Sequence, residues 1–229
     1  MRYLIIGLGT FGRELATSLS LHGNEVIGVD NQPENIQLIK DKVSTVYQLE
    51  STDEAALKIL PLKNIDVVIV AIGKDFGASL KTVALLRKIG VRHIYARAID
   101  SLHQSLLEIF NLDRILTPEK RSATELTYEL GLQAECSVFN ISDDYLILKF
   151  TAPEKFVGHS YRSINFSRFG LVLISAVRKV SEKNVLGLPY SKEMILDLER
   201  KTMEEKVAMK DEIVVMGSRK NIAEFVSSL

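Results

Sequence analysis

The chain has 229 residues, which suits one large domain or two modest ones. Its 29 Lys and Arg residues balance 29 Asp and Glu residues, so electrostatic binding to DNA or RNA is disfavoured. The single cysteine, Cys136, excludes an internal disulfide and a Cys-x-x-Cys metal site, and it suits a reducing compartment. No uncharged apolar run reaches the ~18 residues that cross a bilayer. We therefore expect a cytoplasmic protein that meets a membrane only through a partner.

Strand and helix signals alternate over the first half of the chain. Short apolar runs predict strands at 3–6, 25–30, 44–49, 66–72, 93–97 and 114–116. Helices are predicted after residue 10, after Pro33, and at 54–60, 80–88 and 102–110. The run 66–72 (DVVIVAI) is apolar throughout, which is typical of a central parallel strand covered on both faces. Such alternation predicts a parallel sheet with right-handed crossovers.

The pattern changes after a helix that begins at Thr117-Pro118, runs to about Tyr128 and ends at Gly131. Strands are then predicted at 137–139, 145–150, 171–177 and 213–216. The segment Glu193 to Met209 is charged and weakly periodic, which predicts an exposed helix or a mobile loop. We therefore expect an α/β, Rossmann-like domain over 1–134 and a smaller α+β domain over 135–229.

A glycine fingerprint joins the first strand to the first helix. Gly7-Leu8-Gly9-Thr10-Phe11-Gly12 is a G-x-G-x-x-G motif in the strand-turn-helix setting that gives it meaning. Gly7 permits the tight turn, Gly9 lets a phosphate approach the backbone, and Gly12 lets the helix lie close to the sheet. The free amides at the start of this helix suit a phosphate group.

The second strand ends at Asp30, 18 residues after Gly12. An acid near this spacing accepts the ribose hydroxyl protons of a dinucleotide, and it repels the 2′-phosphate of NADP. The alternative is that the glycines serve packing and that Asp30 is a turn residue at a strand end. The combined pattern favours nucleotide binding.

The commonest chemistry of this fold is hydride transfer with NAD, which needs an acid-base residue beside the nicotinamide. Three of the four histidines fit structural or solvated positions: His22 at a helix end, His93 at a strand start and His103 on a helix surface. His159, in the second domain, is harder to dismiss. A small NAD-dependent oxidoreductase therefore remains the alternative to a non-enzymatic protein.

The whole chain resembles the regulator-of-potassium-conductance (RCK) family, in particular the cytosolic subunits of the bacterial Ktr and Trk potassium uptake systems. The resemblance rests on YLIIGLGTFG, EVIGVD, DVVIVAIG, HIYARA and DRILTPE, and on FVGHSYRSINFSRFGLVLISAVRK with DEIVVMG in the C-terminal part. It implies a gating subunit, not an enzyme. Such subunits dimerise through the crossover helix, here about Pro118 to Tyr128, and form a ring, typically octameric, beneath an integral-membrane potassium pore subunit.

The resemblance also implies ligands and residue roles. ATP, ADP, AMP or NAD/NADH would be bound by the first-strand loop, which includes Thr10 and Phe11, and by Asp30. Ile72 and Gly73 would approach the base, and Arg97 would reach the phosphates; otherwise Arg97 is a solvated strand end. Glu119 matches a position where some members hold a cation such as Mg²⁺ or Ca²⁺, although a carboxylate there also stabilises a helix start.

Two features of the sequence leave the ligand open. Many Ktr-type regulators carry an arginine between the second and third glycines, where this chain has Thr10. A hydroxyl cannot neutralise a γ-phosphate, so strong discrimination between ATP and ADP is in doubt.

Some relatives bind cyclic di-AMP in the C-terminal domain; Ile164, Asn165 and Arg168 lie in that region, but plain dimerisation is the favoured role. A nucleotide sensor for another transporter is the third hypothesis.

Overall fold

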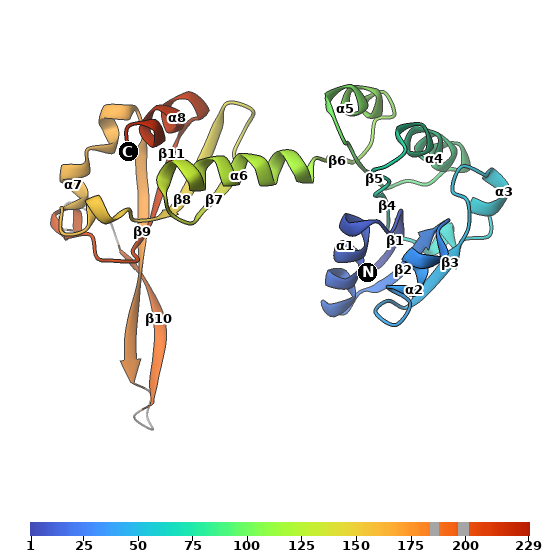
Figure 1. Cartoon of the computed structure of the whole chain (residues 1–229), viewed down its shortest axis with the longest axis horizontal. Helices are drawn as coiled ribbons and strands as arrows, with labels where there is room; N and C mark the ends of the chain where they lie inside the picture. Colours follow the sequence, from blue (N-terminus) through green and yellow to red (C-terminus); the bar gives the residue numbers. More distant parts are fainter. Residues whose placement is uncertain (184–187, 197–201) are drawn as a thin grey trace. The chain divides into compact units, whose positions relative to one another are not determined.

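A computed structural model describes residues 1–183, 188–196 and 202–229. The chain divides into two compact units, Met1–Glu119 and Lys120–Leu229, shown in Figure 1. Each unit has a core of its own, and each is described separately below.

The first unit is built on a six-stranded parallel sheet with strand order β3-β2-β1-β4-β5-β6. The strands are β1 (Arg2–Ile6), β2 (Glu25–Asp30), β3 (Thr45–Gln48), β4 (Val67–Val70), β5 (Ile94–Arg97) and β6 (Arg114–Leu116). The order reverses between β1 and β4, and in open sheets of this kind ligands bind at the carboxyl ends of the strands beside that point. The predicted Rossmann-like sheet is thus confirmed.

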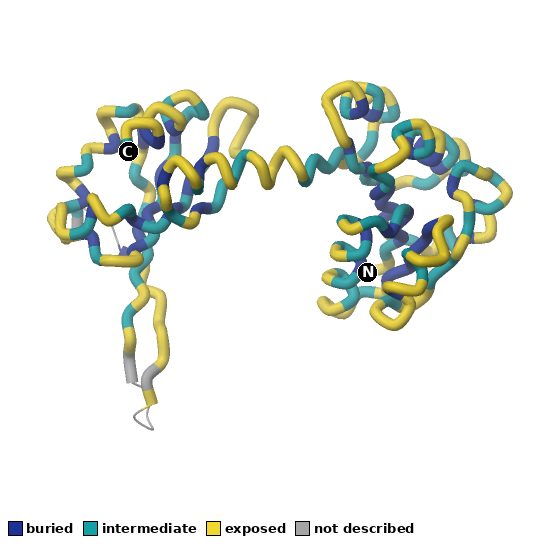
Figure 2. The backbone as a smooth tube through the Cα atoms, in the orientation of Figure 1, coloured by how far each residue is buried: buried dark blue, intermediate teal, exposed yellow. Residues whose placement is uncertain are grey.

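Helices cover both faces of this sheet, which explains why its central strands are apolar on both sides. They are α1 (Thr10–Leu21), α2 (Pro33–Gln37), α3 (Glu54–Leu57), α4 (Phe76–Ile89) and α5 (Ser101–Glu108). One buried cluster joins Leu57, Val83 and Leu107 to one face of the sheet, and a second joins Ala16 and Ile39 to the other. All four residues of β4 are buried, and Figure 2 shows the buried strands at the centre of the unit.

The second unit is an antiparallel sheet with strand order β10-β9-β11-β8-β7. Its strands are β7 (Cys136–Asn140), β8 (Tyr145–Thr151), β9 (Val172–Lys183), β10 (Pro189–Leu196) and β11 (Glu212–Ser218). Its helices are α7 (Tyr161–Ile164), α8 (Arg219–Ser227) and α6 (Pro118–Leu132), of which the first two residues belong to the first unit. Tyr128 and Leu132 of α6 and Phe225 of α8 belong to the same core as the strands.

Several predictions for this unit were wrong. Gly131 does not end α6, because the helix runs to Leu132; a Cβ at Gly131 would lie 2.4 Å from Val226 Cγ1, so the glycine makes room for α8. Helix α8 was not predicted at all. Strand β9 is longer than 171–177 and forms a hairpin with β10 that projects from the unit.

The segment 193–209, predicted as an exposed helix or a mobile loop, begins instead with the last four residues of β10. Residues 197–201 lie outside the described part of the chain. A short 3₁₀ helix, Thr202–Glu204, follows them.

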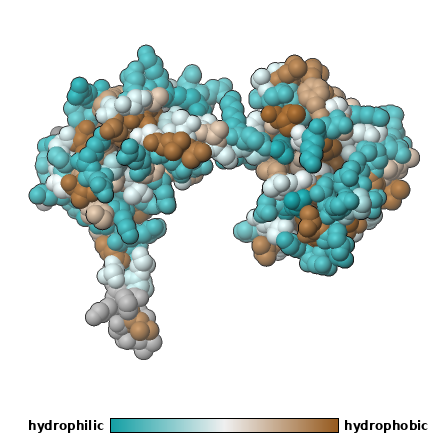
Figure 3. All heavy atoms as spheres, viewed as in Figure 1, coloured by the Kyte–Doolittle hydropathy of each residue, from teal (hydrophilic) through white to brown (hydrophobic). Residues whose placement is uncertain are grey.

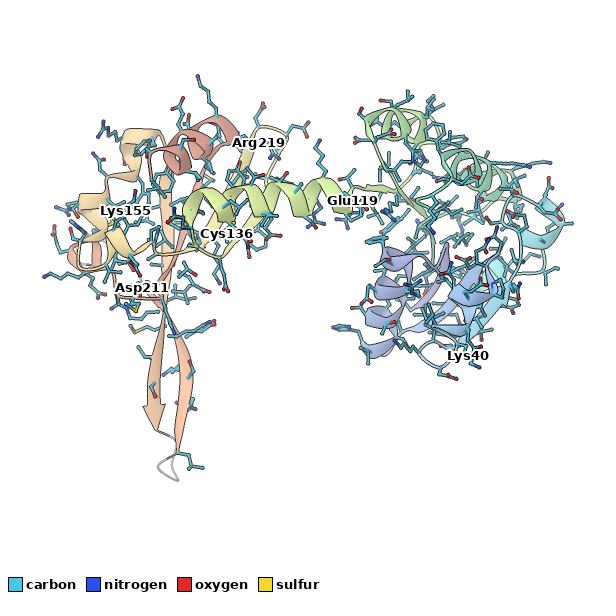
Figure 4. The ribbon with its side chains drawn as sticks, viewed as in Figure 1. Lys40, Glu119, Cys136, Lys155, Asp211 and Arg219 are labelled. Atoms are coloured by element: carbon cyan, nitrogen blue, oxygen red, sulfur yellow. The ribbon has the colours of Figure 1, made fainter. Side chains whose placement is uncertain are left out.

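A buried ionic network ties the end of this segment to β9. Asp211 is 1% exposed and accepts two hydrogen bonds from the Arg178 guanidinium, Nε to Oδ1 at 2.8 Å and Nη2 to Oδ2 at 2.7 Å. The Tyr161 hydroxyl and the Ala208 amide also donate to Oδ2, at 2.7 and 2.8 Å. Burial raises the pKa of Asp211, but these donors outweigh burial and leave its pKa below the usual value. Figure 4 labels Asp211 inside the second unit.

Candidate functional site

The glycine loop at the carboxyl end of β1 has the geometry that its sequence predicts. Gly7 has φ +92°, and a Cβ there would lie 2.9 Å from the backbone nitrogen of Ile72. A Cβ on Gly12 would lie 1.9 Å from the Gly7 carbonyl oxygen, so α1 can cross the loop only with glycine at this position. A Cβ on Gly9 would meet nothing within 4 Å, so Gly9 faces open space. Of the three glycines, Gly9 is the one whose Cβ position the fold leaves open.

Helix α1 begins in this loop without a side-chain cap. Gly9 is its N-cap residue, makes no side-chain hydrogen bond, and is followed by no acid in the first turn. By contrast, α3, α4 and α5 begin with Asp53, Asp75 and Asp100, and each carboxylate accepts a helix amide. The amides and positive end of α1 are therefore free to bind an anion, beside the exposed Thr10 hydroxyl.

Asp30, at the end of β2, is 9% exposed and holds the loop in shape. Its Oδ2 accepts the Leu8 amide at 2.6 Å and its Oδ1 accepts the Gln32 amide at 2.8 Å. Each carboxylate oxygen has two acceptor directions, so Asp30 can still accept a ribose hydroxyl proton. Both interpretations of Asp30 thus have support: it is a structural residue of the turn, and it lies where a ribose acid is expected.

The loops after β4 and β5 lie beside the glycine loop, at the switch point where open sheets of this kind form their ligand crevice, and this edge of the sheet is called the crevice below. Ile72 lies against Gly7, and Gly73 lies against Arg97, because a Cβ on Gly73 would be 2.7 Å from Arg97 Nη1. The Arg97 guanidinium also lies over the Phe11 ring, with Cζ 5.4 Å from the ring centroid. Its side chain is 17% exposed, which excludes a freely solvated strand end. Arg97 therefore faces the glycine loop across the crevice.

Glu119, in the first turn of α6, forms an ion pair with Arg97 Nη2. Figure 4 labels Glu119 at the start of this helix. Glu119 is itself 57% exposed, so the pair lies at the rim of the crevice. The Nε atom of Arg97 is buried and has no hydrogen-bond partner within the part of the chain that the structure describes.

The structure thus brings every predicted site residue to one edge of the first unit's sheet. Their roles in binding stay predictions. Sequence reasoning missed Arg13, whose Nη1 donates to the Leu8 carbonyl at 2.8 Å and to Asn35 Oδ1 at 3.0 Å. The signal was a basic residue directly after the third glycine.

The prediction for His103 was wrong, because this histidine is fully buried and not on a helix surface. It packs on Phe76 at a ring-centroid distance of 4.8 Å, and burial lowers its pKa. His22 ends α1 as predicted, and Nδ1 of His93 lies within hydrogen-bond distance, 2.8 Å, of Asp113 Oδ1. His159 is exposed. None of these side chains belongs to the crevice residues described above.

Metal-binding groups and membrane-spanning helices are both absent from the ranges 1–183, 188–196 and 202–229. Within them, no group of three or more His, Cys, Asp or Glu residues is arranged to hold a metal ion. No helix in these ranges is both long enough and apolar enough to span a bilayer.

Known proteins with similar sequences cover nearly the whole chain. The Ktr system potassium uptake protein C of Bacillus subtilis is 27% identical over 224 residues, which are 97% of this chain and 95% of that protein. The Ktr system potassium uptake protein A of the same organism is also 27% identical, over 98% of this chain and 95% of its own length. The Vibrio alginolyticus protein A is 23% identical over 100% of this chain and 97% of that protein.

Solved structures with the same fold include the GsuK RCK domain, with a TM-score of 0.62 and 16% identity over 97% of this chain. The GsuK channel bound to NAD gives the same TM-score and identity over 98%. This chain spans 46% and 38% of those two chains, respectively. At this identity the likeness shows the fold alone, and it confirms the predicted resemblance to RCK structures.

The family model that describes the TrkA-N domain matches residues 3–118, which include the whole crevice from Gly7 to Arg97. The chain therefore belongs to the TrkA-N family.

Proposed function

We propose that this chain is the nucleotide-binding regulatory subunit of a Ktr/Trk-type potassium uptake system. The observation that carries the proposal is the match to Ktr potassium uptake proteins along almost their full length, in a chain whose glycine loop is intact and open. A regulator of this kind works by binding its ligand more tightly in one conformation than in another. The pore itself would be a separate membrane subunit, beneath which this chain would lie on the cytoplasmic side.

The ligand is an adenine nucleotide: ATP, ADP, AMP or NAD/NADH. The uncapped amides of α1 would bind phosphate at Gly9, Thr10 and Phe11, and Gly7 and Gly12 would shape the loop. Asp30 would accept a ribose hydroxyl proton, and Ile72 and Gly73 would approach the base. Arg97 would supply the positive charge that Thr10 lacks. The similar GsuK channel has been solved with NAD bound, which agrees with this ligand class.

The subunit is proposed to assemble through α6, with domains at 1–134 and 135–229. Leu126 and Leu130 lie one turn apart on this helix and are 52% and 71% exposed, which is unusual for large apolar side chains without a partner. Hydrophobic side chains are visible among the hydrophilic surface of the second unit in Figure 3. A homodimer through α6, repeated into an octameric ring, would cover them.

Two finer ligand hypotheses stay predictions. A divalent cation, Mg²⁺ or Ca²⁺, would bind at Glu119 beside the nucleotide phosphates. Cyclic di-AMP would bind in the second unit near Ile164, Asn165 and Arg168, which lie in or between two short consecutive helices.

The proposal is tested first by isothermal titration with ATP, ADP, AMP, NAD and NADH, each with and without magnesium. Submicromolar to micromolar binding without turnover is expected. Cells of the source organism that lack this gene should then grow poorly at low external potassium. The wild-type gene should restore growth, and the Gly9→Ala variant, which is expected to fold but to bind phosphate more weakly, should restore it less well. Normal growth of the deleted strain would count against the proposal.

The alternative, an NAD-dependent oxidoreductase, makes a different prediction. It requires NADH to be consumed or formed with some member of a panel of carbonyl and hydroxy-acid substrates. Turnover that is lost with Gly9→Ala would favour that alternative over a regulator.

A further inference from the structure

The Arg97–Glu119 pair joins the floor of the crevice to the first turn of α6. Arg97 ends β5 and faces the glycine loop, whereas Glu119 is the second residue of the helix. The guanidinium is fixed on three sides, by the Phe11 ring, by the backbone of Gly73 and by the Glu119 carboxylate. A cation held in this way already has an anion bound to it.

The pair leaves a buried donor atom of Arg97 without a hydrogen bond in the described ranges. Its Nε atom is buried and lacks a partner within the described ranges, although Nη2 is engaged by Glu119. An arginine fork binds carboxylate or phosphate best with two parallel hydrogen bonds, so a single contact is incomplete. A phosphate group that bound Nε together with a terminal nitrogen would make the two parallel hydrogen bonds that Glu119 does not make.

We infer that Glu119 competes with nucleotide phosphate for Arg97, so that phosphate binding breaks the ion pair and frees the first turn of α6. This inference rests on the proposed nucleotide function and explains how occupancy would be passed to the helix. A phosphate and a carboxylate at one guanidinium repel each other, so one must yield unless a cation joins them. By linkage, the factor by which Glu119 weakens phosphate binding equals the factor by which phosphate weakens the ion pair.

The test is isothermal titration of wild type and Glu119→Gln with adenosine, AMP and ADP, in EDTA so that no divalent cation takes part. Glu119→Gln should bind AMP and ADP about two- to fivefold more tightly, the range expected for a partly exposed ion pair. Adenosine, which has no phosphate, should show no difference between the two proteins, since it does not compete for Arg97.

The matched control is Glu14→Gln. Glu14 is an exposed acid on α1, three residues after Phe11, and it has no ion-pair partner in the part of the chain that the structure describes. The Glu14→Gln substitution removes one negative charge near the same loop, as Glu119→Gln does, but leaves the ion pair of Arg97 in place. An equal gain from Glu14→Gln would mean a general charge effect and would overturn the inference.

A double-mutant cycle gives an independent check. In an Arg97→Gln background the gain in affinity from Glu119→Gln should disappear, because the Glu119 carboxylate and the nucleotide phosphate no longer compete for one cation. Unchanged or weaker ADP binding by Glu119→Gln alone would sink the inference while leaving the proposed function intact. Absence of binding of any of the nucleotides to wild type would instead sink the proposed function.

Discussion

Replacing Gly9 by alanine should separate ligand binding from folding. A Cβ at Gly9 meets nothing within 4 Å, and the backbone φ of −59° is ordinary for alanine. The lower entropy of the unfolded alanine chain and the weaker N-cap preference of alanine act in opposite directions, by about 1 kcal/mol or less each. The free energy of unfolding should therefore stay within about 1 kcal/mol of wild type.

Binding should respond quite differently. The new methyl group would occupy the side from which a phosphate approaches the α1 amides. Loss of one charge-assisted hydrogen bond costs about 2 kcal/mol, which corresponds to roughly thirtyfold in the dissociation constant. Titration with ADP measures this loss, and thermal unfolding of the same sample measures the stability.

Gly12→Ala, in the same loop, should instead lower the stability of the fold. Its Cβ would lie 1.9 Å from the Gly7 carbonyl oxygen, so the helix or the loop must shift. Overpacking of this severity costs about 3 kcal/mol, which lowers the melting temperature by roughly 10 °C in a domain of this size.

Wild-type ADP affinity in a folded Gly9→Ala protein would refute the reasoning, because it would mean that phosphate does not approach the loop at Gly9.

Three other outcomes follow from the structure. Asp30→Asn should weaken ADP binding about tenfold in titration, because the amide is a poorer acceptor for both the ribose and the loop. Arg178→Met should lower the free energy of unfolding in urea by about 3 kcal/mol, because Asp211 would stay buried without its cation. Because burial lowers the pKa of His103, its stabilising contribution should be present above about pH 6.5 and be lost as the pH falls, when the unfolded chain takes up a proton. Thermal unfolding between pH 5 and 8 measures this slope, which His103→Phe should flatten.

The crevice was predictable because its residues are local in sequence or fixed by sheet topology. The glycine spacing specifies the turn at β1, and the carboxyl ends of parallel strands necessarily share one edge, which brings Asp30, Ile72 and Arg97 to the loop. The ion pair between Arg97 and Glu119 was not predictable, because side chains 22 residues apart meet only through the register of β5 and β6.

Other elements were missed for identifiable reasons. The apolar residues Leu102 in α5 and Ile109 at its C-cap are 65% and 76% exposed. The hydrophobic pattern therefore indicated the wrong buried face of the helix, and the burial of His103 was missed. For α8 a signal was available, since Ser218 caps the helix and Ile222, Phe225 and Val226 follow at helical spacing. The β9–β10 hairpin was missed because its strands carry charged residues. Residues 178–183 of β9 pair only with β10, so this part of the hairpin does not need apolar side chains.

The arrangement of cations favours a regulator over an oxidoreductase. Arg13 is already bound to the Leu8 carbonyl and Asn35, where it supports the loop from within the unit. Arg97 forms an ion pair with Glu119, which lies in the first turn of α6 where the first unit ends. In the proposed regulator, Thr10 carries no charge to meet a phosphate, so Arg97 would meet it, and release of Glu119 from Arg97 would free the first turn of α6. An oxidoreductase needs no connection between the phosphates and α6, since the phosphates of its cofactor serve only to anchor the cofactor. A regulator, by contrast, needs its ligand to act on the helix through which its subunits would assemble.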